Sequence, residues 1–241
     1  MTRNQKNMKK KTTRPQKTNS AGTLFVVGTP IGNLSDMSER AIETLRQVKQ
    51  IYCEDTRVSR KLLSHFGITG KELERADANK CADIVEKLLI SLNTGVDCAL
   101  ITDSGTPGVS DPGAFLVSVV RDAGYNVMVI PGPSAITSAL SVSGFSADQF
   151  VFLGFPPRKK GRKTFFKNIK RFEDMTIVIY ESPHRILQTL GEIEEVMPEV
   201  NIVICREMTK IFEEVKTGTA SELYKYFQNE KPRGEFVIVI G

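Results

Sequence analysis

The stretch CALITDSGTPGVSDPG, residues 98–113, joins a short apolar run to a loop rich in glycine and proline. Its first four residues have the side chains of a buried strand, and the loop that follows contains Gly105, Gly108 and Gly113. Glycine lets backbone groups approach a ligand closely because it has no side chain. The stretch therefore predicts a strand that ends in a ligand-binding loop.

Strand-like and helix-like stretches alternate through the first half of the chain. LFVV (24–27), QIYC (50–53) and NVMVI (126–130) have the pattern of strands, and apolar residues recur at helical spacing between them. Such alternation predicts βαβ units around a mostly parallel sheet.

The second half predicts a different, mixed sheet. Strand-like runs NIVIC (201–205) and IFEEVKTG (211–218) follow each other too closely for a crossover helix, which indicates antiparallel pairing. We therefore expect an α/β protein with an N-terminal domain at 22–135 and a second α/β domain at 136–241, preceded by an arm at 1–21.

Charge is concentrated at the N-terminus. The chain has 241 residues and a net charge of +5, but residues 1–20 hold seven lysines and arginines and no acid, so the remainder is net negative. The arm is typical of disordered segments and either aids solubility or contacts nucleic acid. Two histidines and four separated cysteines argue against a metal site, and the cysteines fit a reducing cytosol. No apolar run approaches the ~20 residues of a membrane span.

Three glycine- and proline-rich loops follow predicted strands. They are GTPIGN (28–33), DSGTPGVSDPG (103–113) and PGPSA (131–135), and their only charged residues are Asp103 and Asp111. None has a dinucleotide-binding or P-loop motif. Each could be an ordinary turn. As a set at the carboxyl ends of strands, they predict a site for a cationic or zwitterionic ligand rather than a phosphate.

Charged side chains also cluster after two other strands and in one basic run. CEDTRVSRK (53–61) and YESPHR (180–185) carry acids beside arginines. These carboxylates either take part in a reaction, cap a helix or form a plain ion pair with the arginine. We expect Asp111 and Ser182 to cap helices, each with a proline at the first helical position. RKKGRK (158–163), with phenylalanines nearby, is either a solvated face or a surface for RNA phosphates and bases.

Six motifs, in order, carry a family resemblance: VVGTPIGNLSDMSERA, CEDTRVSRKLLSHFGI, ITDSGTPGVSDPG, VIPGPSAITSALSVSGF, YESPHRI and CREMTK. Over nearly all of 23–241 the chain resembles the small-subunit ribosomal RNA (cytidine 2′-O)-methyltransferases of the tetrapyrrole-methylase superfamily. The resemblance implies a cytoplasmic homodimer that binds S-adenosylmethionine between two α/β domains. It also implies methylation of 16S RNA in the decoding region, as naked RNA or in the small ribosomal subunit.

The resemblance also implies the residues of the donor site, and side-chain chemistry suggests the base and the RNA contacts. Those expected at the methyl donor are Pro30, Asp103, Ser104, Gly105, Thr106, Val109, Asp111, Ser134, Ala135, Tyr180 and Glu181. The candidates for the base that accepts the hydroxyl proton are Asp55 and Glu181, followed by Glu54 and Lys210. RNA is expected to contact Arg57, Arg158, Lys159, Lys160, Arg162, Lys163, His184 and Arg185. No metal is expected.

The sequence departs from the family pattern at two places, and two rival functions remain open. ADANK (76–80) stands where relatives have an acidic, histidine-containing segment, and the chain ends at EFVIVIG (235–241) where many relatives continue. We expect the basic arm to replace the RNA contacts of that extension. The rivals are a tetrapyrrole C-methyltransferase on the same fold and a non-catalytic RNA-binding assembly factor.

Overall fold

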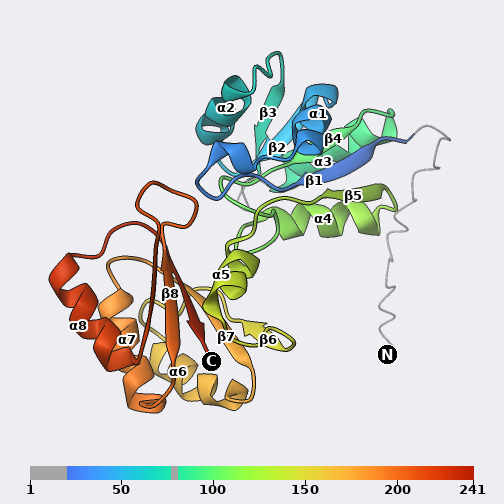
Figure 1. The fold of residues 1–241 in the computed structure, drawn as a ribbon. Helices are drawn as coiled ribbons and strands as arrows, with labels where there is room; N and C mark the ends of the chain where they lie inside the picture. Colours follow the sequence, from blue (N-terminus) through green and yellow to red (C-terminus); the bar gives the residue numbers. More distant parts are fainter. Residues whose placement is uncertain (1–20, 77–80) are drawn as a thin grey trace, which may run out of the picture.

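The computed structural model describes residues 21–76 and 81–241, excluding the side chains of residues 81 and 82. Residues 1–20 of the basic arm, and all of the ADANK segment except Ala76, lie outside the described residues. Figure 1 shows two α/β bodies, one built from each half of the chain. The chain passes from the first sheet to the second through residues 131–134 and helix α5.

The first sheet is entirely parallel. Its strands are β1 (Thr23–Val27), β2 (Gln50–Cys53), β3 (Glu72–Arg75), β4 (Cys98–Leu100) and β5 (Asn126–Ile130), in the order β3-β2-β4-β1-β5. Every neighbouring pair runs parallel. The carboxyl ends of these strands therefore lie at one edge, where the predicted loops begin.

Helices cover both faces of this sheet. They are α1 (Glu39–Gln47), α2 (Thr56–His65), α3 (Cys81–Asn93) and α4 (Gly113–Asp122), with a 3₁₀ turn η1 at Leu34–Asp36. Helices α1 and α2 pack on one face through Leu45 and Leu63. Helices α3 and α4 pack on the other through Leu88 and Val120. The middle strand, β4, is apolar and buried throughout, as is typical of a parallel strand that is covered on both faces.

The second sheet is mixed, as predicted. Its strands are β6 (Phe150–Phe152), β7 (Thr176–Glu181), β8 (Ile202–Arg206), β9 (Glu214–Gly218) and β10 (Phe236–Ile240), in the order β6-β7-β10-β8-β9. Strands β6 and β7 are parallel, whereas the other pairs are antiparallel. The short connection from β8 to β9 thus joins antiparallel neighbours, which confirms the expected fold class.

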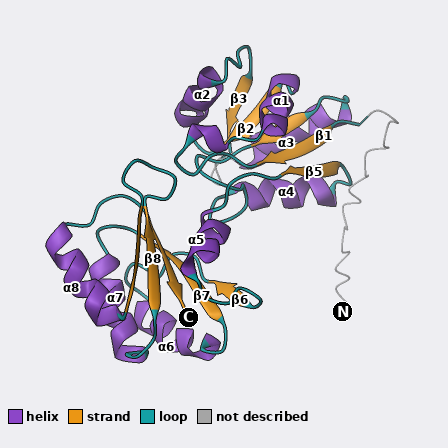
Figure 2. Cartoon of the chain, viewed as in Figure 1, coloured by secondary structure: helices purple, strands orange, loops and turns teal. Residues whose placement is uncertain are grey.

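Helix α5 links the two bodies physically. The helices of the second half are α5 (Ala135–Ser143), α6 (Arg162–Ile169), α7 (Ile186–Val196) and α8 (Ala220–Glu230), with a 3₁₀ turn η3 at Lys170–Phe172. Helices α6, α7 and α8 cover one face of the second sheet, and α5 packs on the other (Figure 2). Ile31, from the loop after β1, joins the apolar cluster under α5. An apolar contact therefore joins the two bodies beside the loops.

Two helices begin later than predicted. Helix α4 begins at Gly113, with Pro112 at its N-cap, because the Asp111 carboxylate accepts hydrogen bonds from the amides of Gly108 and Gly113 and closes a turn. Helix α7 begins at Ile186, because residues 182–185 form a turn in which the Arg185 amide donates to the Ser182 carbonyl at 3.1 Å. None of the helices among residues 21–76 and 81–241 is long and apolar enough to cross a membrane.

Candidate active site

The three glycine-rich loops meet at the carboxyl edge of the first sheet. The Thr29 amide donates to the Gly105 carbonyl at 2.9 Å, and the Gly105 amide donates back to the Thr29 carbonyl at 3.2 Å. Gly105 has a φ of +84°, a conformation that favours glycine. Gly28 and Gly132 approach so closely that a Cβ on Gly28 would lie 2.7 Å from the Gly132 backbone. The loops therefore form one connected framework.

A cavity of about 350 Å³ lies between these loops and the second sheet. All of the residues predicted to bind the donor line it except Pro30, which lies in the wall of a neighbouring cavity. The first body contributes Asp103, Ser104, Gly105, Thr106, Val109 and Asp111, and the chain beyond it contributes Ser134, Ala135, Tyr180 and Glu181. We call this space the first cavity.

The first cavity has acidic walls. Glu54, Asp103, Asp111, Glu181 and Glu235 line it, whereas its described lining contains no lysine, arginine or histidine. Burial raises the pKa of Tyr180 to about 12, so this phenol stays neutral at physiological pH. Such a cavity suits a cation and would repel a phosphate.

Asp103 stands at the centre of this acidic edge. The amide of Asp55 donates to its Oδ1 at 3.1 Å. Glu54 lies beside it, and Oε2 of Glu54 accepts hydrogen bonds from the Thr102 hydroxyl and from the Asp103 amide. Burial raises the pKa of Asp103; the hydrogen bond from Asp55 opposes this, and the charge of Glu54 adds to it. A carboxylate with a raised pKa is a better proton acceptor.

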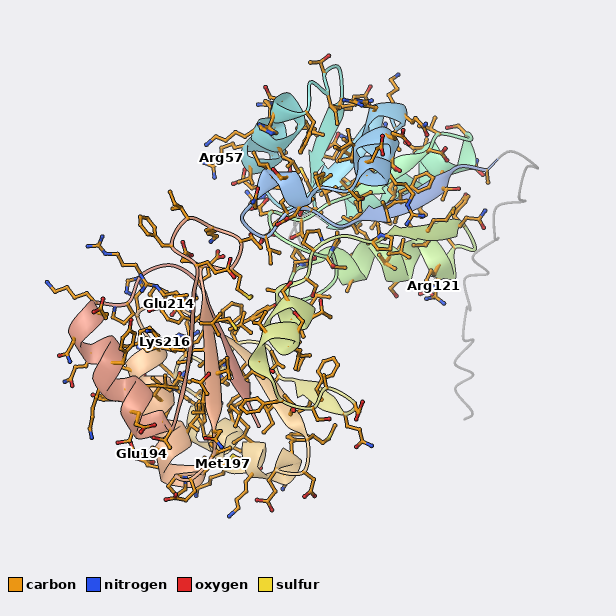
Figure 3. The ribbon with its side chains drawn as sticks, viewed as in Figure 1. Arg57, Arg121, Glu194, Met197, Glu214 and Lys216 are labelled. Atoms are coloured by element: carbon orange, nitrogen blue, oxygen red, sulfur yellow. The ribbon has the colours of Figure 1, made fainter. Side chains whose placement is uncertain are left out.

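Asp55 has a structural role at the start of α2. Its side chain caps the helix by accepting from the Arg57 amide at 2.8 Å, and it forms an ion pair with the Arg57 guanidinium at 2.6 Å. The hydrogen bonds from Arg57 hold the pKa of Asp55 well below its usual value. This geometry makes Asp55 a weak base. Figure 3 shows Arg57 at the outer edge of the upper body.

Glu181 lies in a buried network and is also unsuited to act as a base. Its side chain is fully buried and forms ion pairs with Arg185 at 2.7 Å and Arg162 at 3.6 Å. Thr189 donates a further hydrogen bond to Oε2 at 2.6 Å. The carboxylate is therefore surrounded by donors, which anchor the end of β7 beneath the first cavity.

The placement of Arg162 corrects a sequence-based expectation. Its side chain is only 4% exposed and also pairs with Glu192 at 2.7 Å, so it cannot contact RNA with the rest of the basic run. The helix begins at this residue and turns it inward onto α7. The exposed cations of the run are Arg158, Lys159, Lys160 and Lys163. His184 is also exposed, whereas Arg185 is mostly buried against Glu181.

Lys210 lies on the connection between β8 and β9, in the wall of the neighbouring cavity. Its ammonium contacts Glu207 and Glu235, both at 2.9 Å. Burial lowers the pKa of Lys210, but the hydrogen bonds to Glu235 and Glu207 outweigh this and hold the pKa above its ordinary value. Lys210 is therefore a cation at neutral pH and cannot accept a proton. Of the four predicted bases, only Glu54 has geometry compatible with the role.

Sequence reasoning did not assign several residues that line the first cavity. The segment Gly234–Val237 lies at the start of β10 and reaches the cavity because β10 pairs with β7 at the centre of the second sheet. No motif marks this segment. Phe155, which also lines the cavity, stands out in the sequence only as an aromatic residue beside the basic run.

Comparison with known proteins assigns the fold and the family. Cobalt precorrin-4 methyltransferase, a cobalamin biosynthetic enzyme, superposes with a TM-score of 0.63 at 15% identity, covering 91% of this chain and 94% of the other. Uroporphyrin-III-C-methyltransferase from Thermus thermophilus superposes with a TM-score of 0.59 at 19% identity, covering 90% and 94%. Residues 23–224 match the family described as tetrapyrrole (corrin/porphyrin) methylases. The chain therefore belongs to the tetrapyrrole methylase family and is a methyltransferase, as the sequence motifs predict.

Relatives with much higher identity carry a different name. A protein of Thermotoga maritima named ribosomal RNA small subunit methyltransferase I is 43% identical, with 91% of this chain and 98% of the relative covered. Proteins with the same name from Synechocystis and from Escherichia coli O157:H7 are 42% and 41% identical; the alignments cover 91% and 92% of this chain and 78% of each relative.

Proposed function

We propose that the chain transfers a methyl group from S-adenosylmethionine to the ribose 2′-hydroxyl of a cytidine in small-subunit ribosomal RNA, in the decoding region. The observation that carries the donor assignment is a cavity lined by three carboxylates, Glu54, Asp103 and Asp111, that form no ion pair within the described residues, with no cationic side chain among its described walls. The relatives at 41–43% identity, each named as a ribosomal RNA small subunit methyltransferase, support the acceptor.

The residues of the first cavity fit this donor. Asp103 and Glu54 supply negative charge for a sulfonium and an ammonium group, and the loop at Ser104–Thr106 supplies backbone and hydroxyl groups. Ile31 and Tyr180 supply apolar surface for an aromatic base. The donor brings a methyl group already activated by positive charge. The protein must align the acceptor oxygen and receive its proton.

The exposed cations near the site support an RNA acceptor. Arg158, Lys159, Lys160 and Lys163 form an exposed basic run, and Phe155 beside it is 52% exposed and lines the first cavity. Cations that follow a phosphate backbone, with an aromatic side chain on which a base can stack, are typical of single-stranded RNA binding. We include the basic arm, residues 1–20, as a source of diffuse attraction to the ribosomal particle.

We also propose that the protein works as a homodimer in the cytoplasm. Strand β5 is an edge strand, and its side chains Met128 and Val129 are 53% and 62% exposed. Phe115, on the helix packed against β5, is 46% exposed. An exposed apolar edge of this kind is a surface that a second copy can cover.

The two rival functions make different demands on the same site. A tetrapyrrole C-methyltransferase would keep the donor cavity but would not require the basic run. A non-catalytic RNA-binding factor would keep the basic surface without turnover. The two tetrapyrrole methyltransferases of solved structure are less than 20% identical to this chain, so their similarity supports the fold but not the substrate.

One experiment separates the three functions. The full chain is incubated with methyl-labelled S-adenosylmethionine and, in parallel, with naked small-subunit RNA, isolated small subunits or a tetrapyrrole precursor. We expect label in RNA, located by nuclease digestion at a 2′-O-methylcytidine. Label in the tetrapyrrole alone would establish the first rival, and RNA binding without label in any acceptor would establish the second.

A further inference from the structure

A second cavity of about 350 Å³ adjoins the first. It lies among the loop after β1, helix α2 and the connection between β8 and β9. The two cavities share five lining residues: Ile31, Thr102, Asp103, Ser104 and Glu235. Asp103 and Ser104 therefore face both cavities. A residue that takes part in methyl transfer between a donor in one cavity and an acceptor in the other must lie at such a shared wall.

The walls of the second cavity suit one ribonucleotide. Leu34, Val58 and Leu62 provide apolar surface on one side, which fits the face of a base. Lys61 is exposed, lies in the same wall and has no ion pair within residues 21–76 and 81–241, so it is available to a phosphate.

The charged groups of the second cavity differ from those of the first. Lys61 and Lys210 accompany the carboxylates of Asp103 and Glu235, whereas the described walls of the first cavity carry carboxylates alone. Glu207 and Glu235 already hold the ammonium of Lys210. Lys61 is therefore the cation that a phosphate can approach. The two spaces thus have the complementary preferences that a cationic donor and an anionic acceptor require.

We propose that the target nucleotide leaves its base stack and enters this second cavity, with its 2′-hydroxyl at the Asp103–Ser104 wall and with Asp103 as the proton acceptor. This inference rests on the proposed function. Enzymes that act on a base move the nucleotide out of the stack into a pocket, and a cavity that accepts the face of a base holds its nucleotide in the same way. The position of Lys61, on the exposed side of α2, would leave the neighbouring phosphates outside the cavity.

The proposed step balances in atoms and charge. The 2′-oxygen forms a bond to the methyl carbon, the carbon–sulfur bond breaks, and its electron pair stays on sulfur to give a neutral thioether. The hydroxyl proton passes to the Asp103 carboxylate and then to solvent. Asp103 is favoured over Glu54 because it lines both cavities, whereas Glu54 lines only the first.

Filling the second cavity tests the acceptor site. Val58→Trp places a large side chain in this wall, and Ile90→Trp, on exposed α3, is the matched control. With small subunits as substrate, we expect Val58→Trp to slow single-turnover transfer by about 10²-fold through misplacement of the acceptor, with donor Kd from calorimetry within about twofold of wild type. Ile90→Trp should transfer at the wild-type rate. Wild-type transfer by Val58→Trp would overturn the proposal.

RNA kinetics of Lys61→Glu, read together with RNA labelling by the wild type, show whether the nucleotide site or the proposed function has failed. Lys61→Glu should raise the KM for RNA with little change in kcat, and normal RNA kinetics in this variant would contradict the nucleotide site even if Val58→Trp failed to fold. If wild-type protein labels no RNA, the proposed function fails. If wild type labels RNA and both variants behave normally, only the second cavity is wrong.

The pH dependence tests the role of Asp103. The charged and titratable groups around Asp103 are Cys53, Glu54, Asp55, Arg57, Lys61, Arg75, Lys210 and Glu235. With saturating donor, the wild-type transfer rate should rise with pH as the Asp103 carboxyl ionises, then level off once that carboxyl is fully ionised, because only the carboxylate accepts the proton. Asp103→Asn should be slow at every pH and should lack this rise. A variant that keeps the rise would assign the proton to another group.

Discussion

Glu181 and Arg162 show how one buried charge is held beside the donor cavity. Glu181 lines the first cavity yet is fully buried, and its charge is compensated by Arg162 and Arg185. Removal of one partner from a buried pair is strongly destabilising because the other charge remains in a poor solvent. The network thus explains why the basic run contains one arginine that cannot serve RNA.

We predict that Arg162→Met lowers the free energy of unfolding by about 3–5 kcal/mol. Urea unfolding followed by circular dichroism measures the change, and Lys163→Met, exposed in the same helix, should stay within about 0.5 kcal/mol of wild type. Equal stability of the two variants would mean that Arg185 alone compensates Glu181.

Gly105 offers a prediction about donor binding. Its φ of +84° strains any branched residue, and a Cβ there would lie 3.4 Å from Ile31. We expect Gly105→Val to raise the donor Kd at least about tenfold, the effect of about 1.4 kcal/mol. Gly67→Val is the matched control, because Gly67 also has a positive φ of +64° but, apart from its chain neighbours, no atom of the described residues lies within 4 Å of its Cβ position. If both variants bound the donor with the same Kd, the loop that contains Gly105 would not be part of the donor site.

At the scale of elements, the parallel strands were the most predictable feature. Because their carboxyl ends share one edge, loops far apart in sequence could be expected to meet, and the structure brings Ile31, Asp103 and Ser134 to one cavity. Strand β3, with the sequence ELER, gave no signal because it is a short, polar edge strand.

The second half of the site was harder to predict for a physical reason. Antiparallel register, rather than local sequence, brings Phe236 opposite Glu181 and places Gly234–Val237 in the cavity wall. Burial of Arg162 depends on the point at which α6 begins, and helix boundaries are weakly encoded. The second cavity depends on the β8–β9 connection reaching the loop after β1, where Thr209 accepts from the Asn33 amide.

The exposed cations near α6 carry a prediction for RNA binding. Replacement of Lys159, Lys160 and Lys163 by alanine should weaken RNA binding and make the plot of log K against log salt shallower by about 2, near 0.7 for each lost phosphate contact. Donor affinity should not change, since these residues lie outside the first cavity.

The control for the basic run removes three cations elsewhere. Lys49, Lys87 and Arg121 lie on the first body, and Figure 3 shows Arg121 on α4, on the opposite side of that body from Arg57. We expect alanine at these three positions to leave the salt slope near the wild-type value. A slope that is the same for both triple variants and the wild type would make the run a solvated face.

At the scale of the whole molecule, the two bodies are joined where the chemistry is proposed. Ile31 from the first body packs with Val237 and Met208 of the second, and the Lys210 ammonium contacts Glu235 beside the shared wall. A change that separates the bodies would therefore alter both cavities together. A substitution at a residue that lines only one cavity is therefore needed to assign the ligand of that cavity.

Assembly of two copies gives the last prediction. Among the residues that the structure describes, strand β5 is hydrogen-bonded to a neighbouring strand on one side only, and Met128 and Val129 expose apolar surface along it. We expect light scattering to give wild-type protein a mass of about twice the 26.8 kDa of one chain. The double variant Met128→Lys with Val129→Lys should have the mass of one chain, because each lysine would have to be desolvated at the interface. Ile211→Lys, at a side chain 91% exposed on the β8–β9 connection, should leave the mass unchanged. A double variant that keeps the wild-type dimer mass would place the interface on another face, and a wild-type mass of one chain would remove the dimer from the proposal.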